Sequence, residues 1–138
     1  SVTIDQKLYS EIGKGFLVLI GICDEDTKET ADKMVRKLIG MRIFSDENGK
    51  TNLALKDVDG QLLLVSQFTL YADCKKGNRP SFVKAGSPQH ANELYEYIID
   101  ACKKEVPVVK TGVFGAEMEV ALINDGPFTI ILDSKDLA

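Results

Sequence analysis

Apolar and polar positions along the chain first mark out short strands. Val2 and Ile4 alternate with polar neighbours, which predicts a strand with one buried face. Residues 16–23 are apolar at almost every position, as in a strand that is covered on both faces. Residues 61–70 form a second strongly apolar strand, which follows Asp59-Gly60, a dipeptide typical of hairpin turns.

Two longer stretches repeat their apolar residues every three or four positions, as amphipathic helices do. The first extends from about Thr27 to Phe44. The second begins at Pro88 and ends near Lys104, with lysines in its last turn, where the helix dipole favours cations. Between the two helices, residues 72–87 show no periodicity, and we expect a long polar and basic loop there.

The last third of the chain returns to strand patterns. Residues 106–109 look extended, and residues 128–132 resume a strand after a turn at 124–127. Between them, Met118, Val120 and Leu122 alternate with Glu117, Glu119 and Ala121, as in another strand. Strands grouped around two helices predict an α+β fold. We therefore expect a single domain over residues 1–138, in which a curved, barrel-like β-sheet is covered by two helices.

The composition agrees with a folded domain and argues against several classes of protein. Apolar residues make up 44% of the 138 residues and charged residues 28%, so intrinsic disorder is excluded. The 17 Lys and Arg residues against 21 Asp and Glu residues give a net charge of −4. This charge disfavours a general nucleic-acid coater, but a local basic patch could still hold one end of an RNA. No apolar run approaches the roughly 20 residues of a membrane span and no signal-peptide pattern opens the chain, so we expect a cytoplasmic protein without a membrane partner.

The usual catalytic constellations are sparse. His90 has no nucleophile near it in the sequence, so a surface position on the second helix is the simpler interpretation. Cys23, Cys74 and Cys102 lack the spacing of metal ligands, so we expect reduced thiols and no metal site. Cys74 borders two lysines, and cations lower a thiol pKa, yet a loop cysteine is more often incidental. Neither GxGxxG nor GxxxxGK[ST] occurs, so no nucleotide cofactor is expected.

Two segments do not look like ordinary structural elements. In residues 66–73 an apolar strand ends in small polar side chains. If strand alternation continues, Gln67 and Thr69 share a face and offer amide, hydroxyl and backbone N–H groups to a ligand oxygen. The alternative is a strand whose polar face meets water.

The second segment is residues 124–129, between two apolar strands. Gly126 has no side chain and Pro127 has no N–H, so the backbone is bare and stiff there. Such a backbone could approach a small ligand closely. The alternative is a tight turn without a further role.

Together these segments resemble the D-aminoacyl-tRNA deacylase family of the bacterial and eukaryotic type. Its Ser-Gln-x-Thr motif is matched by Ser66, Gln67, Phe68 and Thr69. Its Asn-x-Gly-Pro-x-Thr motif is matched by Asn124, Asp125, Gly126, Pro127, Phe128 and Thr129. Two family stretches between the motifs also match, at residues 76–82 and 112–118. Members usually begin with one further strand, which includes an arginine and which this sequence lacks before Ser1.

The resemblance implies a hydrolase that cleaves the ester between a D-amino acid, or mischarged glycine, and the 3′-terminal adenosine of tRNA. This is a proofreading step in translation. The family members are homodimers, and their Gly-Pro peptide is cis and reaches into the partner's site. Gly126 and Pro127 of one copy would then face residues 66–69 of the other.

The resemblance also assigns roles to individual residues. Catalysis is implied for Ser66, Gln67, Phe68 and Thr69. Substrate binding and chiral selection are implied for Asn124, Gly126, Pro127 and Thr129, with Phe114 and Met118 either beside the adenosine or in the core. The expected tRNA contacts are Lys75, Lys76, Arg79 and Lys84.

Two questions stay open at this point. The ester could be attacked by Thr69, or by water that the ribose 2′-OH assists while backbone N–H groups near Gln67 and Phe68 hold the oxyanion. We favour water, because the sequence places no base beside Thr69. The other functional classes are a non-catalytic RNA- or protein-binding module and a related enzyme that edits L-aminoacyl-tRNA, although the intact Ser66-Gln67 pair favours the D-specific type.

Overall fold

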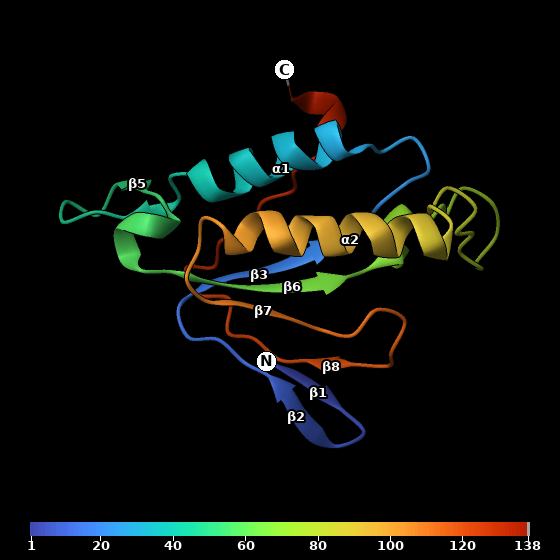
Figure 1. Ribbon diagram of the computed structural model, residues 1–138, viewed down its shortest axis with the longest axis horizontal. Helices are drawn as coiled ribbons and strands as arrows, with labels where there is room; N and C mark the ends of the chain where they lie inside the picture. Colours follow the sequence, from blue (N-terminus) through green and yellow to red (C-terminus); the bar gives the residue numbers. More distant parts are fainter. Residues whose placement is uncertain (138) are drawn as a thin grey trace.

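A parallel three-stranded sheet forms the centre of the computed structural model, which describes residues 1–137. Its strands lie in the order β3 (Gly15–Ile20), β6 (Gln61–Ser66) and β7 (Val109–Thr111). Parallel neighbours need crossover connections, and the helices α1 (Lys28–Gly40) and α2 (Pro88–Lys103) provide them. Both helices lie on one face of this sheet (Figure 1).

A second, antiparallel sheet lies against the other face. Its order is β2 (Lys7–Ser10), β1 (Val2–Ile4) and β8 (Glu119–Val120). After β8 the chain passes to the short 3-10 helix η3 (Ser134–Asp136), which contacts α1 (Figure 1).

A small hairpin follows α1. It pairs β4 (Phe44–Ser45) with β5 (Thr51–Leu53), and the 3-10 helix η1 (Leu55–Val58) leads from it to β6.

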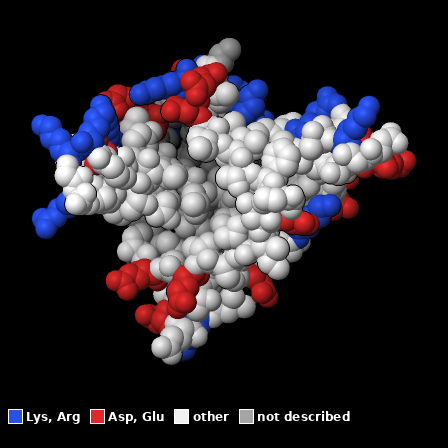
Figure 2. Space-filling model, turned by 180° about the vertical axis from the view of Figure 1, so that it is seen from behind, with Lys and Arg blue, Asp and Glu red and all other residues white. Residues whose placement is uncertain are grey.

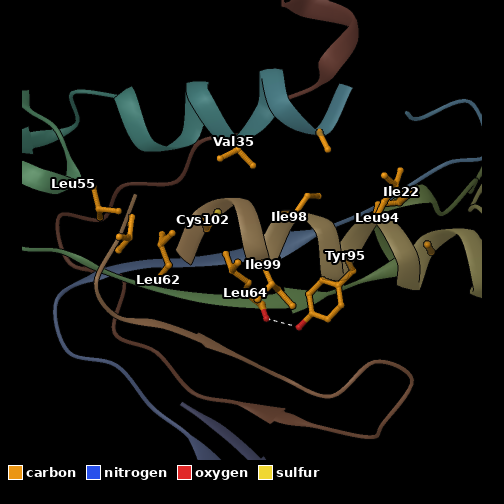
Figure 3. Packing of buried hydrophobic residues seen from close by; sticks show 13 residues of the cluster. Ile22, Val35, Leu55, Leu62, Leu64, Leu94, Tyr95, Ile98, Ile99 and Cys102 are labelled. Carbon is orange, nitrogen blue, oxygen red and sulfur yellow. Dashed lines mark hydrogen bonds between the residues drawn. The ribbon is translucent and has the colours of Figure 1, made fainter. Parts of the chain in front are cut away.

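Strand β6 separates two apolar cores, because successive side chains of a strand point to opposite faces. Leu62 and Leu64 join the larger core beneath the helices, while Leu63 and Val65 pack with Val2 on the other side. Figure 3 shows the larger core, in which the Tyr95 hydroxyl donates to the Leu64 carbonyl at 2.7 Å. Burying each such aliphatic side chain stabilises the fold by about 1.5–3 kcal/mol, so the two cores fix the position at which β6 ends.

Both helices begin where the sequence predicts. Thr27 caps α1 and exchanges hydrogen bonds with Thr30, and Ser87 caps α2 ahead of Pro88 in its first turn. The first helix ends at Gly40 rather than near residue 44, because Met41 is already extended and the chain turns into the small hairpin.

Three predictions about strands are wrong. Asp59-Gly60 does not form a hairpin, because Asp59 adopts a left-handed conformation that ends η1 and β6 then pairs in parallel with β3. The second apolar strand stops at Ser66 rather than at residue 70. Residues 128–132 form no strand, because no neighbouring strand pairs with them in the described chain.

The predicted α+β class holds in its coarser form. Residues 1–137 combine two α-helices with several small sheets, and these sheets do not close into a barrel. Within the same residues, no helix is both long and apolar enough to cross a membrane.

Candidate functional site

Residues 66–69 lie where the parallel sheet ends. Ser66 pairs with Ile20 at the carboxyl edge of β6, and the Gln67 N–H donates to the Ile20 carbonyl at 2.8 Å. The chain then turns into the 3-10 helix η2 (Phe68–Tyr71). Ligands of open parallel sheets bind outside the carboxyl ends of the strands, so this edge is a suitable place for a site.

The helical turn changes the predicted arrangement of side chains. Strand alternation does not apply to residues 68–71, because they form a 3-10 turn. The Phe68 and Leu70 side chains remain 56% and 55% exposed. The amide of Gln67 instead reaches the hydroxyl of Thr69, donating from Nε2 to Oγ1. An amide is not a base, so this contact orients the Thr69 hydroxyl without removing its proton.

Support for η2 comes from the residues just after β3. A Cβ atom on Gly21 would lie 3.1 Å from Cβ of Leu70 and 3.2 Å from the Tyr71 ring, so a glycine lets η2 approach the strand closely. Burial, followed by contact with the Cys23 thiol, raises the pKa of the Tyr71 hydroxyl. Burial likewise raises the pKa of Cys23. This support was not predicted from the sequence, although the glycine at the end of an apolar strand was a usable signal.

The basic loop, residues 72–87, folds back on itself. Asp73 and Ser81 exchange backbone hydrogen bonds of 2.7 and 2.9 Å, and the Asp73 carboxylate forms an ion pair of 3.3 Å with Lys84. The pKa of Asp73 is lowered, first by the Lys75 N–H bond and then by Lys84. Of the four predicted tRNA contacts, Lys84 is thus already paired with an acid.

The other three predicted cations of this loop are exposed. The loop is joined to η2 by the rings of Phe68 and Phe82, whose centroids lie 5.2 Å apart. Because the hydrogen bonds of the Asp73 side chain go to Lys75 and Lys84, its carboxylate is not hydrogen-bonded to Thr69.

The Gly-Pro loop, residues 124–129, is closed by its own motif residues. The Asn124 side chain donates to Oγ1 of Thr129 at 2.8 Å and accepts the Phe128 N–H at 2.9 Å. The Gly126–Pro127 peptide is cis, as the family resemblance implies. Every residue from 121 to 131 is exposed, so the loop projects from the rest of the chain.

The predicted site residues therefore form separate groups within one chain. Residues 66–69 lie together, and residues 124–129 form their own closed loop. Phe114 packs 6.2 Å from the Tyr95 ring at the edge of the larger core, and Met118 packs in the smaller one, which corresponds to the core alternative for both.

His90 differs from the prediction of a surface position. Its side chain is partly buried, and Nε2 lies 2.9 Å from the Asp26 carbonyl. The imidazole thus ties the start of α2 to the chain just before α1. The missed signal was its place in the first turn of an amphipathic helix, where it can reach the preceding crossover.

One face of the molecule carries no charged side chains at its centre. Figure 2 shows Lys, Arg, Asp and Glu gathered along the margins of this face and a hollowed, uncharged centre. Large apolar side chains are exposed near β3, on η2 and along the C-terminal segment. These are Leu19, Phe68, Leu70, Leu122, Ile123, Phe128, Ile130 and Ile131. Apolar side chains that are exposed singly are normal, whereas a contiguous exposed apolar patch marks an interaction surface.

Comparisons with known proteins agree with the resemblance. The family model for D-Tyr-tRNA(Tyr) deacylase matches residues 1–133. The chain is 54% identical to a D-aminoacyl-tRNA deacylase of Clostridium novyi over 135 residues, which is 98% of this chain and 91% of that protein. It is 51% identical to the D-aminoacyl-tRNA deacylase of Thermosipho africanus, with 97% and 90% covered.

Two solved structures share the fold. The c-Myc DNA Unwinding Element Binding Protein superimposes with a TM-score of 0.90 at 40% identity, over 96% of this chain and 91% of that chain. A "probable eukaryotic D-amino acid tRNA deacylase" superimposes with a TM-score of 0.72 at 18% identity, over 86% and 84%.

Proposed function

The chain belongs to the D-Tyr-tRNA(Tyr) deacylase family and is a D-aminoacyl-tRNA deacylase, a hydrolase of tRNA proofreading; we propose that it performs this reaction with residues 66–69 of one copy and the Gly-Pro loop of a second. The observation that carries the function is the family match over residues 1–133. The assignment of roles to residues rests on the geometry of the two motifs.

The 66–69 segment is proposed to hold the ester carbonyl and the attacking oxygen. The Gln67 N–H is already bonded to Ile20, so it is not available to an oxyanion. The Phe68 N–H, in the first turn of η2, is the donor that we assign to this role. Thr69, oriented by Gln67, contacts the reacting group, and Ser66 places the segment at the end of β6.

Chiral selection is assigned to the Gly-Pro loop. In this proposal the carbonyls of Gly126 and Pro127 bind the α-amino group and occupy the space that an L side chain would need, while a D side chain points to solvent. Glycine, which has no side chain to exclude, is also a substrate. Asn124 and Thr129 hold the loop in shape through their 2.8 Å hydrogen bond.

The basic loop is proposed to contact the phosphates next to the 3′ end. Lys75, Lys76 and Arg79 are exposed on this loop, which η2 touches through Phe68 and Phe82. Lys84 orders the loop through Asp73 and contributes its charge less directly. Phosphate contacts of this kind position a nucleic acid without reading its sequence.

A second copy of the chain is proposed to complete the site. The Gly-Pro loop projects from its own chain, and exposed apolar side chains such as Phe128 and Leu70 lie on both motif-bearing segments. A twofold interface covers the same patch on both copies. It would bury these side chains and bring each Gly-Pro loop to the partner's 66–69 segment.

Mixing two inactive variants tests whether the site is shared. Thr69→Phe blocks one half of the site and Gly126→Val blocks the other. If the halves come from different copies, mixed dimers contain one intact site, and activity returns to about a quarter of the wild-type value after random exchange. If both halves come from one copy, mixing restores nothing. Sedimentation of the wild-type protein as a stable monomer also contradicts the proposal.

The activity itself is tested with charged tRNA. We expect release of D-tyrosine from D-tyrosyl-tRNA and no release of L-tyrosine from the L-form. Release of the L-form alone would indicate a related L-editing enzyme, and binding without turnover of either would indicate a non-catalytic RNA-binding module.

Several further features belong to the same proposal. The chain acts as one domain, in which the two larger sheets curve toward an open barrel. The protein works in the cytoplasm on aminoacyl-tRNA, and residues 66–69 need no cofactor for an ester that is already activated.

A further inference from the structure

A groove lined by cations extends along the second half of α1. Its volume is about 560 Å³. The residues that line it are Lys33, Arg36, Lys37, Gly40, Met41, Arg42, Ile43 and Leu137. Four of these eight residues are cationic and none is acidic, in a chain whose net charge is −4. We call this feature the α1 groove.

The cations of the α1 groove are not engaged by acids. Among residues 1–137, the ion pairs within 4.0 Å are Lys56–Glu105 and Lys84–Asp73, neither of which involves the groove. Asp32, the acid nearest in sequence, accepts the Tyr97 hydroxyl at 2.8 Å and lines a second hollow between α1 and α2, which Arg36 also borders without forming an ion pair there. The positive charge of the groove is therefore available to a ligand.

Helix geometry places the cations together. Lys33, Arg36 and Lys37 are three and four residues apart, so they share one face of α1. Arg42, just beyond the helix, is held by Asn52, which accepts from Nε with its carbonyl at 2.9 Å and from Nη2 with its side chain. A guanidinium fixed in this way needs little reorganisation to bind an anion.

A purely structural explanation covers only part of this cluster. The helix dipole favours cations in the last turn, which accounts for Lys37. It does not account for Lys33, which lies in the middle of α1, or for Arg42, which follows the helix. The helix dipole also does not explain why none of the residues that line the groove is acidic.

The α1 groove is far from the proposed reaction site. The beginning of α1 lies near the end of the basic loop, because His90, just after that loop, contacts Asp26, just before α1. From there the 13 residues of α1 extend about 20 Å away from the basic loop. Figure 1 shows the far end of α1 beside β5, opposite the end of the sheet that carries η2. A ligand that reached both places would have to be a macromolecule. A nucleic-acid duplex carries about one charge per 1.7 Å of its axis, so it could present several phosphates over this distance.

We propose that the α1 groove binds phosphate groups of the tRNA backbone, away from the aminoacylated 3′ end. This inference rests on the proposed function, since it assigns a second contact surface to the same substrate. Arginine and lysine together suit phosphodiester oxygens, and such contacts add affinity without sequence specificity.

A charge-matched pair of triple variants tests the α1 groove through the binding of uncharged tRNA. The groove variant is Lys33→Gln/Arg36→Gln/Lys37→Gln. The control variant is Lys7→Gln/Lys103→Gln/Lys110→Gln, at exposed lysines outside the groove. We expect the groove variant to bind tRNA at least about tenfold more weakly and to lower the salt slope by roughly two to three units. The control variant should stay close to wild type.

Several outcomes would overturn the proposal. One is an unchanged affinity and slope for the groove variant, and another is an equal loss for the control variant, which would indicate a general charge effect. Free phosphate is the other source of the same chemistry. If inorganic phosphate stabilises the wild-type protein against heat but not the groove variant, while tRNA affinity is unchanged, the groove is a phosphate site and not a tRNA surface.

Hydrolysis of two substrates separates this inference from the proposed function. The groove variant should raise KM for D-tyrosyl-tRNA but hydrolyse 3′-D-tyrosyl-adenosine, which has no backbone phosphates, as the wild-type protein does. If the groove variant loses activity on both substrates while the wild-type protein keeps it, the assignment of the groove to tRNA phosphates is wrong. If the wild-type protein hydrolyses neither substrate, the proposed function is wrong. The tRNA-binding experiment then still shows whether the groove binds tRNA.

Discussion

Asn124 donates a hydrogen bond from Nδ2 to Oγ1 of Thr129 over 2.8 Å, across the Gly126–Pro127 peptide. The same side chain accepts the Phe128 N–H at 2.9 Å. Within residues 1–137, the side-chain hydrogen bonds of the first and last residues of the Asn-x-Gly-Pro-x-Thr motif thus stay inside the motif. This arrangement explains why the motif needs an amide at one end and a hydroxyl at the other, with a bare backbone between them.

Removing this contact should loosen the Gly-Pro loop. Asn124→Ala deletes two hydrogen bonds, each with a net value of about 0.5–1.5 kcal/mol. Because the loop is exposed, we expect Tm to change little while turnover of D-tyrosyl-tRNA falls. Thr129→Val, which removes one of the two bonds and keeps the shape, should cause the smaller loss. If both variants turn over D-tyrosyl-tRNA at the wild-type rate, the Gly-Pro loop does not need the hydrogen bond between Asn124 and Thr129.

Gly21 is predicted to control the position of Thr69 without touching substrate. In Gly21→Ala the new methyl group meets Cβ of Leu70 at 3.1 Å, so η2 must move by a few tenths of an ångström. Overpacking of this kind typically costs about 1–3 kcal/mol. We expect a lower Tm together with a fall in kcat, because the Gln67–Thr69 pair shifts with η2. Gly13→Ala is the control, since its methyl group would lie 3.7 Å from the Gln61 side chain and should leave both values near wild type.

The three thiols should react with iodoacetamide in a fixed order. Cys74 is exposed, Cys23 is partly buried, and Cys102 is fully buried. Burial raises the pKa of Cys102 to about 11, so little thiolate forms there near neutral pH. Mass spectrometry of the native protein should find Cys74 modified first and Cys102 last. Early modification of Cys102 would show that the larger core opens readily.

Much of the fold follows from the spacing of apolar residues. The strand at residues 16–20 and the start of α2 at Pro88 were predictable, because a continuous apolar run and a proline in the first turn have local signatures. The expected cover on both faces was wrong for this strand, because β3 lies at the edge of the sheet and is only partly buried. The parallel pairing of β3 with β6 was not predictable in the same way. Asp59-Gly60 has the composition of a hairpin turn, and only the tertiary pairing of β6 decides that it ends a 3-10 helix.

In the candidate site, too, some features have local signatures in the sequence and others depend on tertiary contacts. Motif residues such as Gln67 and Asn124 could be identified from the resemblance, but their contacts depend on backbone turns that no periodicity reveals. The 3-10 turn after Ser66 replaces the expected strand alternation. His90 gains its contact with Asp26 from a crossover 64 residues away in sequence, which local patterns do not record.

The basic loop should show unequal contributions from its cations. Lys76→Gln removes an exposed charge, and we expect it to lower the salt slope of tRNA binding by roughly one unit. Lys84 is paired with Asp73 at 3.3 Å, so Lys84→Gln should change the slope less while loosening the loop. Titration of both variants with uncharged tRNA over a range of salt concentrations measures the difference. A larger slope change for Lys84→Gln would mean that the ion pair opens on binding.

The attacking group can be identified at the substrate. Thr69 Oγ1 is hydrogen-bonded to the Gln67 amide, and Asp73 is bonded to Lys75 and Lys84, so no carboxylate or imidazole is hydrogen-bonded to Thr69 to take its proton. This geometry favours water assisted by the ribose 2′-OH. D-tyrosyl-tRNA that ends in 2′-deoxyadenosine should then react about 100- to 1000-fold more slowly, the usual loss for one well-placed transition-state contact. Thr69→Ala should keep measurable turnover of the normal substrate, and Thr69→Ser should keep more. If Thr69 is the nucleophile instead, Thr69→Ala abolishes turnover, the deoxy substrate still reacts with the wild-type protein, and a covalent D-tyrosyl ester on Thr69 accumulates under rapid acid quenching.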